Sequence, residues 1–141
     1  MVIRTLGTAG ESYKRLIESI NKQIIKPEEI IVVLPVGYTL DYITGEETIF
    51  YSDKGMVSQR AAGIQCAKSE YILVVDDDIE FADNMIYELY SYMLKNSLNC
   101  CLPMEGNDNG EKTILIDYPL LKKVRGFITG QLFTRNKETA Y

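Results

Sequence analysis

Residues 71–78, YILVVDDD, place three carboxylates directly after a run of five apolar residues. A continuous run of this kind is typical of a strand that is buried on both faces of a parallel sheet. Because an unpaired buried carboxylate is costly even after the protein relaxes around it, we expect the strand to end at about Val75. The three acids then stand at its carboxyl end, which is the edge where ligands bind in open α/β sheets.

Asp76, Asp77 and Asp78 offer clustered carboxylate oxygens, the hard ligands that Mg²⁺ and Mn²⁺ prefer. One interpretation is therefore a divalent metal that holds a diphosphate. The other is a solvated acidic turn in which Asp78 or Asp83 caps the helix that follows. The acids alone do not decide between the two.

The composition predicts one soluble globular domain over residues 1–141, with 46% hydrophobic and 25% charged residues. The net charge of −5 gives no basic field that would attract nucleic acid or an anionic membrane. The absence of histidine excludes Ser-His and Cys-His nucleophile pairs and His-ligated zinc. An anionic substrate would have to be held locally, by a metal, an arginine or backbone amides.

The cysteines and apolar runs bear on the compartment. Cys66, Cys100 and Cys101 are odd in number and lack a framework spacing, which favours buried thiols in a reducing compartment. The sequence begins without a signal-peptide pattern, and its longest apolar run, residues 30–36, is too short to span a membrane. We expect a cytoplasmic protein without a membrane span.

The chain alternates strand-like and helix-like segments. We expect strands at residues 2–6, 29–34, 48–51, 71–75, 98–102 and 113–116, and helices at 12–23, 54–67 and 81–95, the first of them capped by Ser12. Such alternation predicts parallel strands with right-handed crossovers, and hence an α/β fold. Arg60 lies in the first turns of the second helix. It is either a surface salt-bridge arginine or, at the same sheet edge as the acids, a contact for a phosphate or nucleotide.

The order of these motifs resembles the family 2 glycosyltransferases of the GT-A fold, which transfer a sugar from a nucleotide-diphosphate donor with inversion. The segments that carry the resemblance are residues 4–7, 17–23, 29–33, 55–63 and 69–78, the last like the family's metal-binding Asp-x-Asp signature. The resemblance covers about residues 2–94. It implies a GT-A (Rossmann-like) three-layer α/β/α fold with a mostly parallel central sheet.

The resemblance also implies roles for single residues. Thr5 would lie by the nucleotide and Arg60 near a UDP- or GDP-type donor. Asp76 would stand on the ribose or base side and share with Asp78 the divalent metal, Mn²⁺ or Mg²⁺. Asp77 would hold the variable middle position within the nucleotide-sugar-binding set.

Three departures from the family pattern leave the donor base and the chemistry open. Leu34 and Pro35 stand where the family has an acidic residue that contacts the base, and Leu6 and Gly7 replace a Tyr-Asn pair. The family's general base lies in an acidic motif beyond a Gly-rich strand that residues 127–135 resemble, and the sequence stops at residue 141. We therefore expect a C-terminally truncated domain that is by itself inactive or weakly hydrolytic.

A second hypothesis is a non-catalytic module of the same fold that binds a partner, for instance as a homodimer. A receiver-type phospho-acceptor domain is disfavoured. Its acidic pair should follow the first strand, whereas residues 76–78 follow the fourth.

Overall fold

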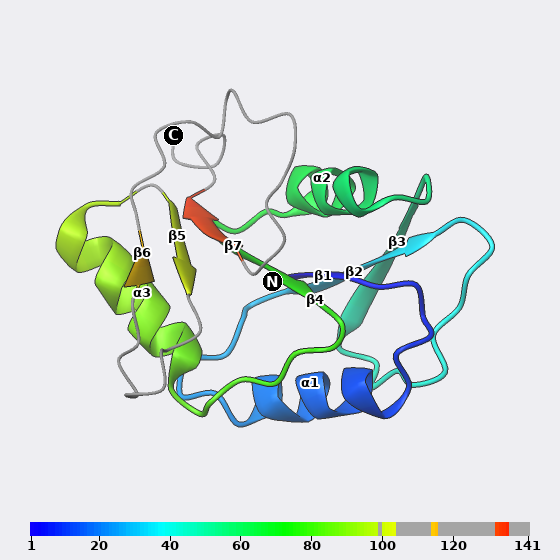
Figure 1. Ribbon diagram of the computed structural model, residues 1–141, viewed down its shortest axis with the longest axis horizontal. Coiled ribbons are helices and arrows are strands. Elements are labelled where there is room, and N and C mark those ends of the chain that lie inside the picture. The colour runs from blue at the N-terminus through cyan, green and yellow to red at the C-terminus, as the bar shows by residue number, and fades with distance from the viewer. Residues whose placement is uncertain (99, 104–113, 116–131, 136–141) are drawn as a thin grey trace.

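The computed structural model describes residues 1–98, 100–103, 114–115 and 132–135 (Figure 1). Within these residues, seven strands form a sheet in the order β3-β2-β1-β4-β7-β5-β6. The strands are β1 (Val2–Arg4), β2 (Ile30–Pro35), β3 (Glu47–Ser52), β4 (Tyr71–Asp76), β5 (Cys100–Pro103), β6 (Ile114–Leu115) and β7 (Leu132–Arg135). The helices are α1 (Glu11–Asn21), α2 (Met56–Cys66) and α3 (Met85–Asn96).

The half of the sheet that contains β1 to β4 is parallel. β1 pairs with both β2 and β4, and β2 pairs with β3, all in the parallel sense. β7 then pairs antiparallel with β4 and with β5, and β5 with β6. The predicted α/β fold with parallel strands at its centre is confirmed.

The helices cover the sheet from both sides, with α1 and α2 on opposite faces (Figure 1). Successive strand residues point to opposite faces, so Ile3 and Val75 pack with α1 and α3 while Val2 and Val74 pack with α2. Each such fully buried side chain contributes about 1.5–3 kcal/mol. These two cores confirm the three-layer α/β/α arrangement.

The close approach of α2 to the sheet depends on Gly63. A Cβ atom at this position would lie 2.2 Å from Cγ1 of Val2 and 3.0 Å from Cγ2 of Val33. Gly63 therefore lies at a point of close contact between α2 and the sheet.

Several expectations about element ends are wrong: β1 ends at Arg4 and not at residue 6, and α3 begins at Met85 and not at residue 81. β4 continues through Asp76, one residue further than expected, because that carboxylate is paired with arginines, as described below. α1 begins after Gly10 and α3 after Asn84, and neither helix has a side-chain capping hydrogen bond. Ser12, Asp78 and Asp83 therefore do not act as the predicted caps.

Two further expectations concern the thiols and the late part of the chain. Cys101 is buried as predicted, whereas Cys66 is only partly buried, so the prediction of a buried thiol is wrong for Cys66. The expected strand at 113–116 is seen as β6, and of the Gly-rich segment 127–135 only β7 is described, so residues 127–131 lie outside the described part. Among the described residues, no helix is long and apolar enough to cross a membrane.

Candidate functional site at the carboxyl edge of the sheet

The order of the strands creates a switch point between β1 and β4. The chain leaves β1 for β2 by way of α1, on one face, and reaches β4 on the other side of β1 by way of α2, on the opposite face (Figure 1). In open α/β sheets such a reversal opens a crevice at the carboxyl ends of the two strands, where ligands bind. Arg4 and Asp76 are register partners at these ends, so Thr5 and Asp77 are the first residues beyond them.

Asp76 is held by two arginines on the α2 side. Nη2 of Arg60 donates to its two carboxylate oxygens at 2.8 and 2.7 Å, and Nη1 of Arg4 lies 3.8 Å from Oδ1. Arg60 is only 2% exposed, whereas the Asp76 side chain is 25% exposed. Arg60 is therefore a buried arginine, and the surface salt-bridge interpretation is wrong.

Asp77 turns to the other side, toward Thr5. The hydroxyl group of Thr5 donates a hydrogen bond to Oδ2 of Asp77 and accepts one from the backbone N–H of Gly7 at 2.8 Å. The backbone N–H of Thr5 donates to the carbonyl of Val33 at 3.2 Å. The structure thus brings Thr5 and Asp77 together, and the hydroxyl group of Thr5 acts as both donor and acceptor.

Gly7 explains one of the departures from the family pattern. Its φ of +75° lies in the left-handed region, and a Cβ atom there would come within 2.0 Å of the Thr39 carbonyl oxygen. The connection between β2 and β3 packs this closely against the turn after β1. A larger residue at position 7 does not fit this backbone.

Asp78 is the exposed member of the acidic triplet. The three consecutive carboxylates thus enter three environments: arginines for Asp76, Thr5 for Asp77 and solvent for Asp78. Within the described part of the chain, no three His, Cys, Asp or Glu side chains gather into a metal cage. Asp77 and Asp78 still offer hard oxygen ligands, and Mg²⁺ is commonly held by one or two carboxylates plus substrate phosphates and water. The residues fit a cation that binds together with a diphosphate.

A cavity of about 390 Å³ opens on the α1 side of this edge. Its lining residues are Gly7, Gly10, Glu11, Tyr13, Lys14, Leu40, Asp41 and Tyr42, and we call it the Tyr13 cavity. Tyr13 is 2% exposed, and its hydroxyl group has no hydrogen-bond partner among the described residues. Burial, and then the charges of Glu47, Asp77 and Tyr42, raise the pKa of Tyr13 well above its ordinary value. The hydroxyl group therefore stays protonated, and its proton has no acceptor among the described residues.

Tyr13 is a residue of this edge that the sequence analysis did not single out. Its helical spacing with Leu16, Ile17 and Ile20 is that of a core residue, and it does belong to the core on the α1 face. Its place in the first turn of a helix that follows a strand end was the available signal, because this turn lies at the ligand-binding edge.

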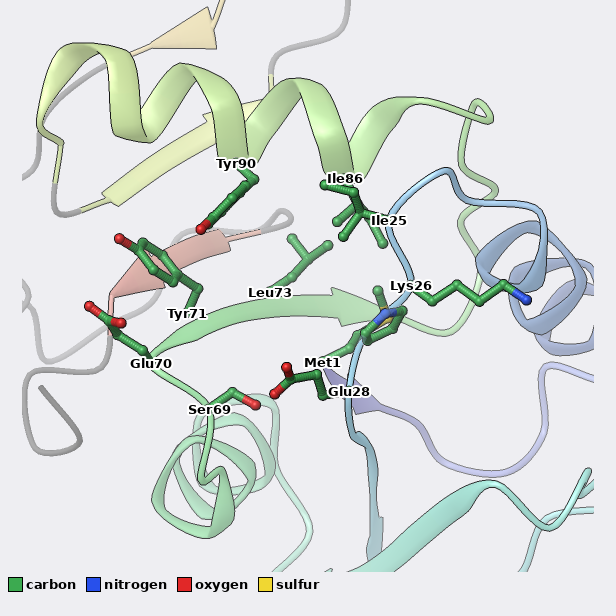
Figure 2. Close-up of a pocket in the computed structure, with 11 residues that line it drawn as sticks. Met1, Ile25, Lys26, Glu28, Ser69, Glu70, Tyr71, Leu73, Ile86 and Tyr90 are labelled. Carbon is green, nitrogen blue, oxygen red and sulfur yellow. The ribbon is translucent and has the colours of Figure 1, made fainter.

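A second cavity, of about 420 Å³, lies at the opposite edge of the sheet (Figure 2). Figure 2 shows Met1, Tyr71, Leu73, Ile86 and Tyr90 around it. It adjoins the first residue of β4, whereas the acidic triplet begins at the last residue of that strand. Although it is the larger cavity, it is remote from the acidic triplet, and we do not include it in the candidate site.

The amino edge of the sheet is fixed by Glu29 and the chain terminus. The carboxylate of Glu29 accepts hydrogen bonds from the N–H of Lys68 and from both the N–H and the hydroxyl of Ser69, at 2.8–2.9 Å. Burial alone would raise the pKa of Glu29, but these bonds and the α-amino group of Met1 outweigh it and lower the pKa. The Met1 ammonium donates to the Glu29 carbonyl at 2.6 Å, and burial lowers its pKa to about 6 although Glu29 counteracts the shift.

The fold resembles solved structures of another protein. The crystal structure of S. aureus TarS 1-349 matches with a TM-score of 0.55 and 16% sequence identity, over 78% of this chain and 36% of that one. The structure of TarS 1-349 in complex with UDP matches to the same extent. The chain thus spans about a third of the length of these structures. At this identity the likeness shows the fold alone, and it confirms the expected GT-A architecture.

Sequence comparison adds the family. No curated protein sequence matches the chain. The family model for glycosyl transferase family 2 matches residues 48–139, which include α2, β4 and the acidic triplet but not Thr5 or Tyr13. That match covers more than half of the chain and confirms the resemblance seen in its motifs. The chain belongs to glycosyl transferase family 2.

Proposed function

We propose that this chain is the donor-binding part of an inverting glycosyltransferase and binds a UDP- or GDP-type nucleotide sugar together with a divalent cation. The observation that carries the proposal is the position of Asp78, an exposed carboxylate beside the Thr5–Asp77 hydrogen bond at the switch point of the sheet. Family membership and the UDP complex of the structural neighbour TarS support a nucleotide donor.

We assign the metal, Mn²⁺ or Mg²⁺, to Asp78 with Asp77. A divalent cation at this place would neutralise the charge that gathers on the departing nucleoside diphosphate. Asp76, expected as the second ligand, accepts hydrogen bonds from Arg60 on both carboxylate oxygens, so a metal there would lie beside a positively charged guanidinium. In our proposal Asp76 instead keeps Arg60 and Arg4 at this edge, where their positive charge favours phosphate.

The Tyr13 cavity is our candidate for the nucleoside half of the donor. The Tyr13 hydroxyl is buried without an acceptor among the described residues and would donate a hydrogen bond once the ligand's entry exposes it, and the exposed Asp41 carboxylate in the same lining can accept one. Uracil and guanine both carry an N–H next to a carbonyl group, and that pair matches one acceptor and one donor. Asp41 would then contact the base, as the family's acidic residue does at the position where this chain has Leu34 and Pro35.

We assign no general base within this set of residues. Inverting transfer needs a group that removes the proton of the acceptor hydroxyl as the new bond forms. We therefore propose that the chain alone binds the donor without transferring the sugar. A cytoplasmic location and a homodimer belong to the same set of proposals.

The test is calorimetric titration of UDP and GDP into the chain, with and without Mn²⁺. We expect metal-dependent binding of at least one nucleotide and its loss in Asp78→Ala. Asp83→Ala is the matched control, because Asp83 is also exposed and follows the triplet by only a few residues. Binding that needs no metal, or that Asp83→Ala weakens as much as Asp78→Ala, would refute the assignment.

A further inference from the structure

Gln59 joins the two strand ends on the α2 side of the site. It is 0% exposed and directly precedes Arg60 on α2. Its Nε2 donates to the carbonyl of Thr5 at 2.7 Å and to the carbonyl of Val33 at 2.8 Å. One side-chain amide therefore links α2 to the turn after β1 and to β2.

These bonds complete the set that fixes Thr5. Its N–H donates to Val33, its carbonyl accepts from Gln59, and its hydroxyl bonds to Gly7 and Asp77. Thr5 is also fully buried, so its carbonyl has no access to bulk water in place of Gln59. The orientation of the Asp77 carboxylate thus depends on Thr5, and the position of Thr5 depends on Gln59.

The side-chain oxygen of Gln59 makes an unfavourable contribution to stability. Oε1 of Gln59 is buried and has no hydrogen-bond partner among the described residues. A buried acceptor without a partner is unfavourable, and the two bonds of Nε2 offset that cost. An apolar side chain at this position would avoid it but could not hold Thr5.

We propose that Gln59 is a positioning residue of the donor site. Two consecutive residues of α2 then hold two consecutive acids: Arg60 holds Asp76 directly, and Gln59 holds Asp77 through Thr5. Gln59 does not touch the donor itself. The inference rests on the proposed function, because the quantity that it changes is the affinity for the nucleotide.

A double-mutant cycle tests this dependence, with UDP and Mn²⁺ titrated into the full chain. Gln59→Met removes the amide at similar length, and Thr5→Val removes the hydroxyl at similar shape. We expect each variant to bind about tenfold more weakly, and the double variant no more weakly than the weaker single variant, because residues in one hydrogen-bond network couple. Gln59→Leu provides a second probe of the position if Gln59→Met does not fold.

Gln23 is a matched control for burial and bonding. It is 3% exposed, and its Nε2 donates to the carbonyls of Ser19 and Ala82, as that of Gln59 does to two other carbonyls. It contacts neither Thr5 nor the acidic triplet. We expect Gln23→Met to lower the stability of the chain and to leave the affinity of the folded protein for UDP unchanged.

The outcomes separate the positioning role from the proposed function. If the unmodified chain binds UDP and Gln59→Met binds it equally well, or if the effects of Gln59→Met and Thr5→Val simply add, Gln59 has only a structural role. If the unmodified chain binds no nucleotide, the proposed function fails and the role of Gln59 fails with it. Non-additive losses with an unaffected Gln23→Met would establish the positioning role.

Discussion

The hydroxyl group of Thr5 donates a hydrogen bond to the carboxylate of Asp77 and so joins the carboxyl ends of β1 and β4. The two residues are 72 positions apart in the sequence. Their contact depends on the parallel pairing of β1 with β4, which sets Arg4 opposite Asp76 and brings the next residue of each strand together. The contact lies at the switch point of the sheet, and the chemistry proposed for this chain is built around it.

The ion pair of Asp76 with Arg60 should be important for stability. Asp76→Asn takes a negative charge away from a guanidinium that is only 2% exposed. Because Asp76 is itself partly exposed, we expect a loss near the lower end for broken buried pairs, about 2–3 kcal/mol. Urea unfolding measures the loss, and Asp78→Asn is the control, with an expected change within about 0.5 kcal/mol. Equal effects of the two variants would mean that the ion pair contributes little.

Gly63 should reverse the usual effect of alanine in a helix. At an open helical position, Gly→Ala stabilises a protein by about 1 kcal/mol. In Gly63→Ala the new Cβ would lie 2.2 Å from Val2, so we expect a loss of about 1–3 kcal/mol from overpacking. Thermal or urea unfolding gives the sign, with Gln65→Ala on the exposed side of α2 as control. A more stable Gly63→Ala would show that α2 is less closely packed on the sheet.

Gly7 and Gly10 form a matched pair for the turn after β1. Both have positive φ, but a Cβ at Gly7 would meet the Thr39 carbonyl at 2.0 Å, whereas a Cβ at Gly10 would have nothing within 4 Å. Gly10→Ala should therefore cost only the strain of a backbone conformation that L residues rarely adopt (φ 53°, ψ −121°), about 1–3 kcal/mol. We expect Gly7→Ala to cost more and also to weaken UDP binding, since the turn carries Thr5. Calorimetry measures the affinity of both variants for UDP, and urea unfolding measures their stability. Equal losses in the two variants would mean that the clash at Gly7 is unimportant.

The buried α-amino group should make stability rise with pH near neutrality. Burial lowers the pKa of the Met1 ammonium from 8.0 to about 6, so between these values the unfolded chain binds more protons than the folded one. The free energy of unfolding then increases as the pH rises from about 6 to 8, by up to about 2 kcal/mol.

The absence of histidine makes this pH dependence easy to assign. The measurement is urea unfolding across the interval, on protein that retains Met1 with a free α-amino group. Blocking the amine by acetylation should flatten the profile. A stability that falls over the interval would contradict the burial of the terminus.

Apolar runs and their spacing were sufficient to predict the layers of the fold. Residues 71–75 and 29–34 read as buried strands because strands covered on both faces are almost continuously apolar, and both are strands in the structure. Helix caps were not predictable in this way. Ser12 and Asp83 have suitable side chains, but α1 begins after Gly10 and α3 begins after Asn84.

The sequence predicted where the candidate site lies but not which residues the acids contact. Three acids after a buried strand indicate the carboxyl edge, yet consecutive residues point to different sides. Asp76 meets Arg60 because α2 packs on that face of the sheet, and Asp77 meets Thr5 because β1 pairs with β4. Tyr13 and Gln59, for which we propose roles in the site, were not predicted, because a buried residue of this kind looks in sequence like any other core residue.

The most direct test of the central claim is a titration of Mn²⁺ followed by the electron paramagnetic resonance signal of the free ion. With only Asp77 and Asp78 as protein ligands, the chain alone should bind Mn²⁺ weakly. With protein and UDP together, the signal of free Mn²⁺ should fall well below its value with UDP alone or with protein alone. Asp78→Ala should abolish this additional Mn²⁺ binding. Equal Mn²⁺ binding with and without UDP, or no excess over UDP alone, would contradict a donor site in which the cation and the diphosphate bind together.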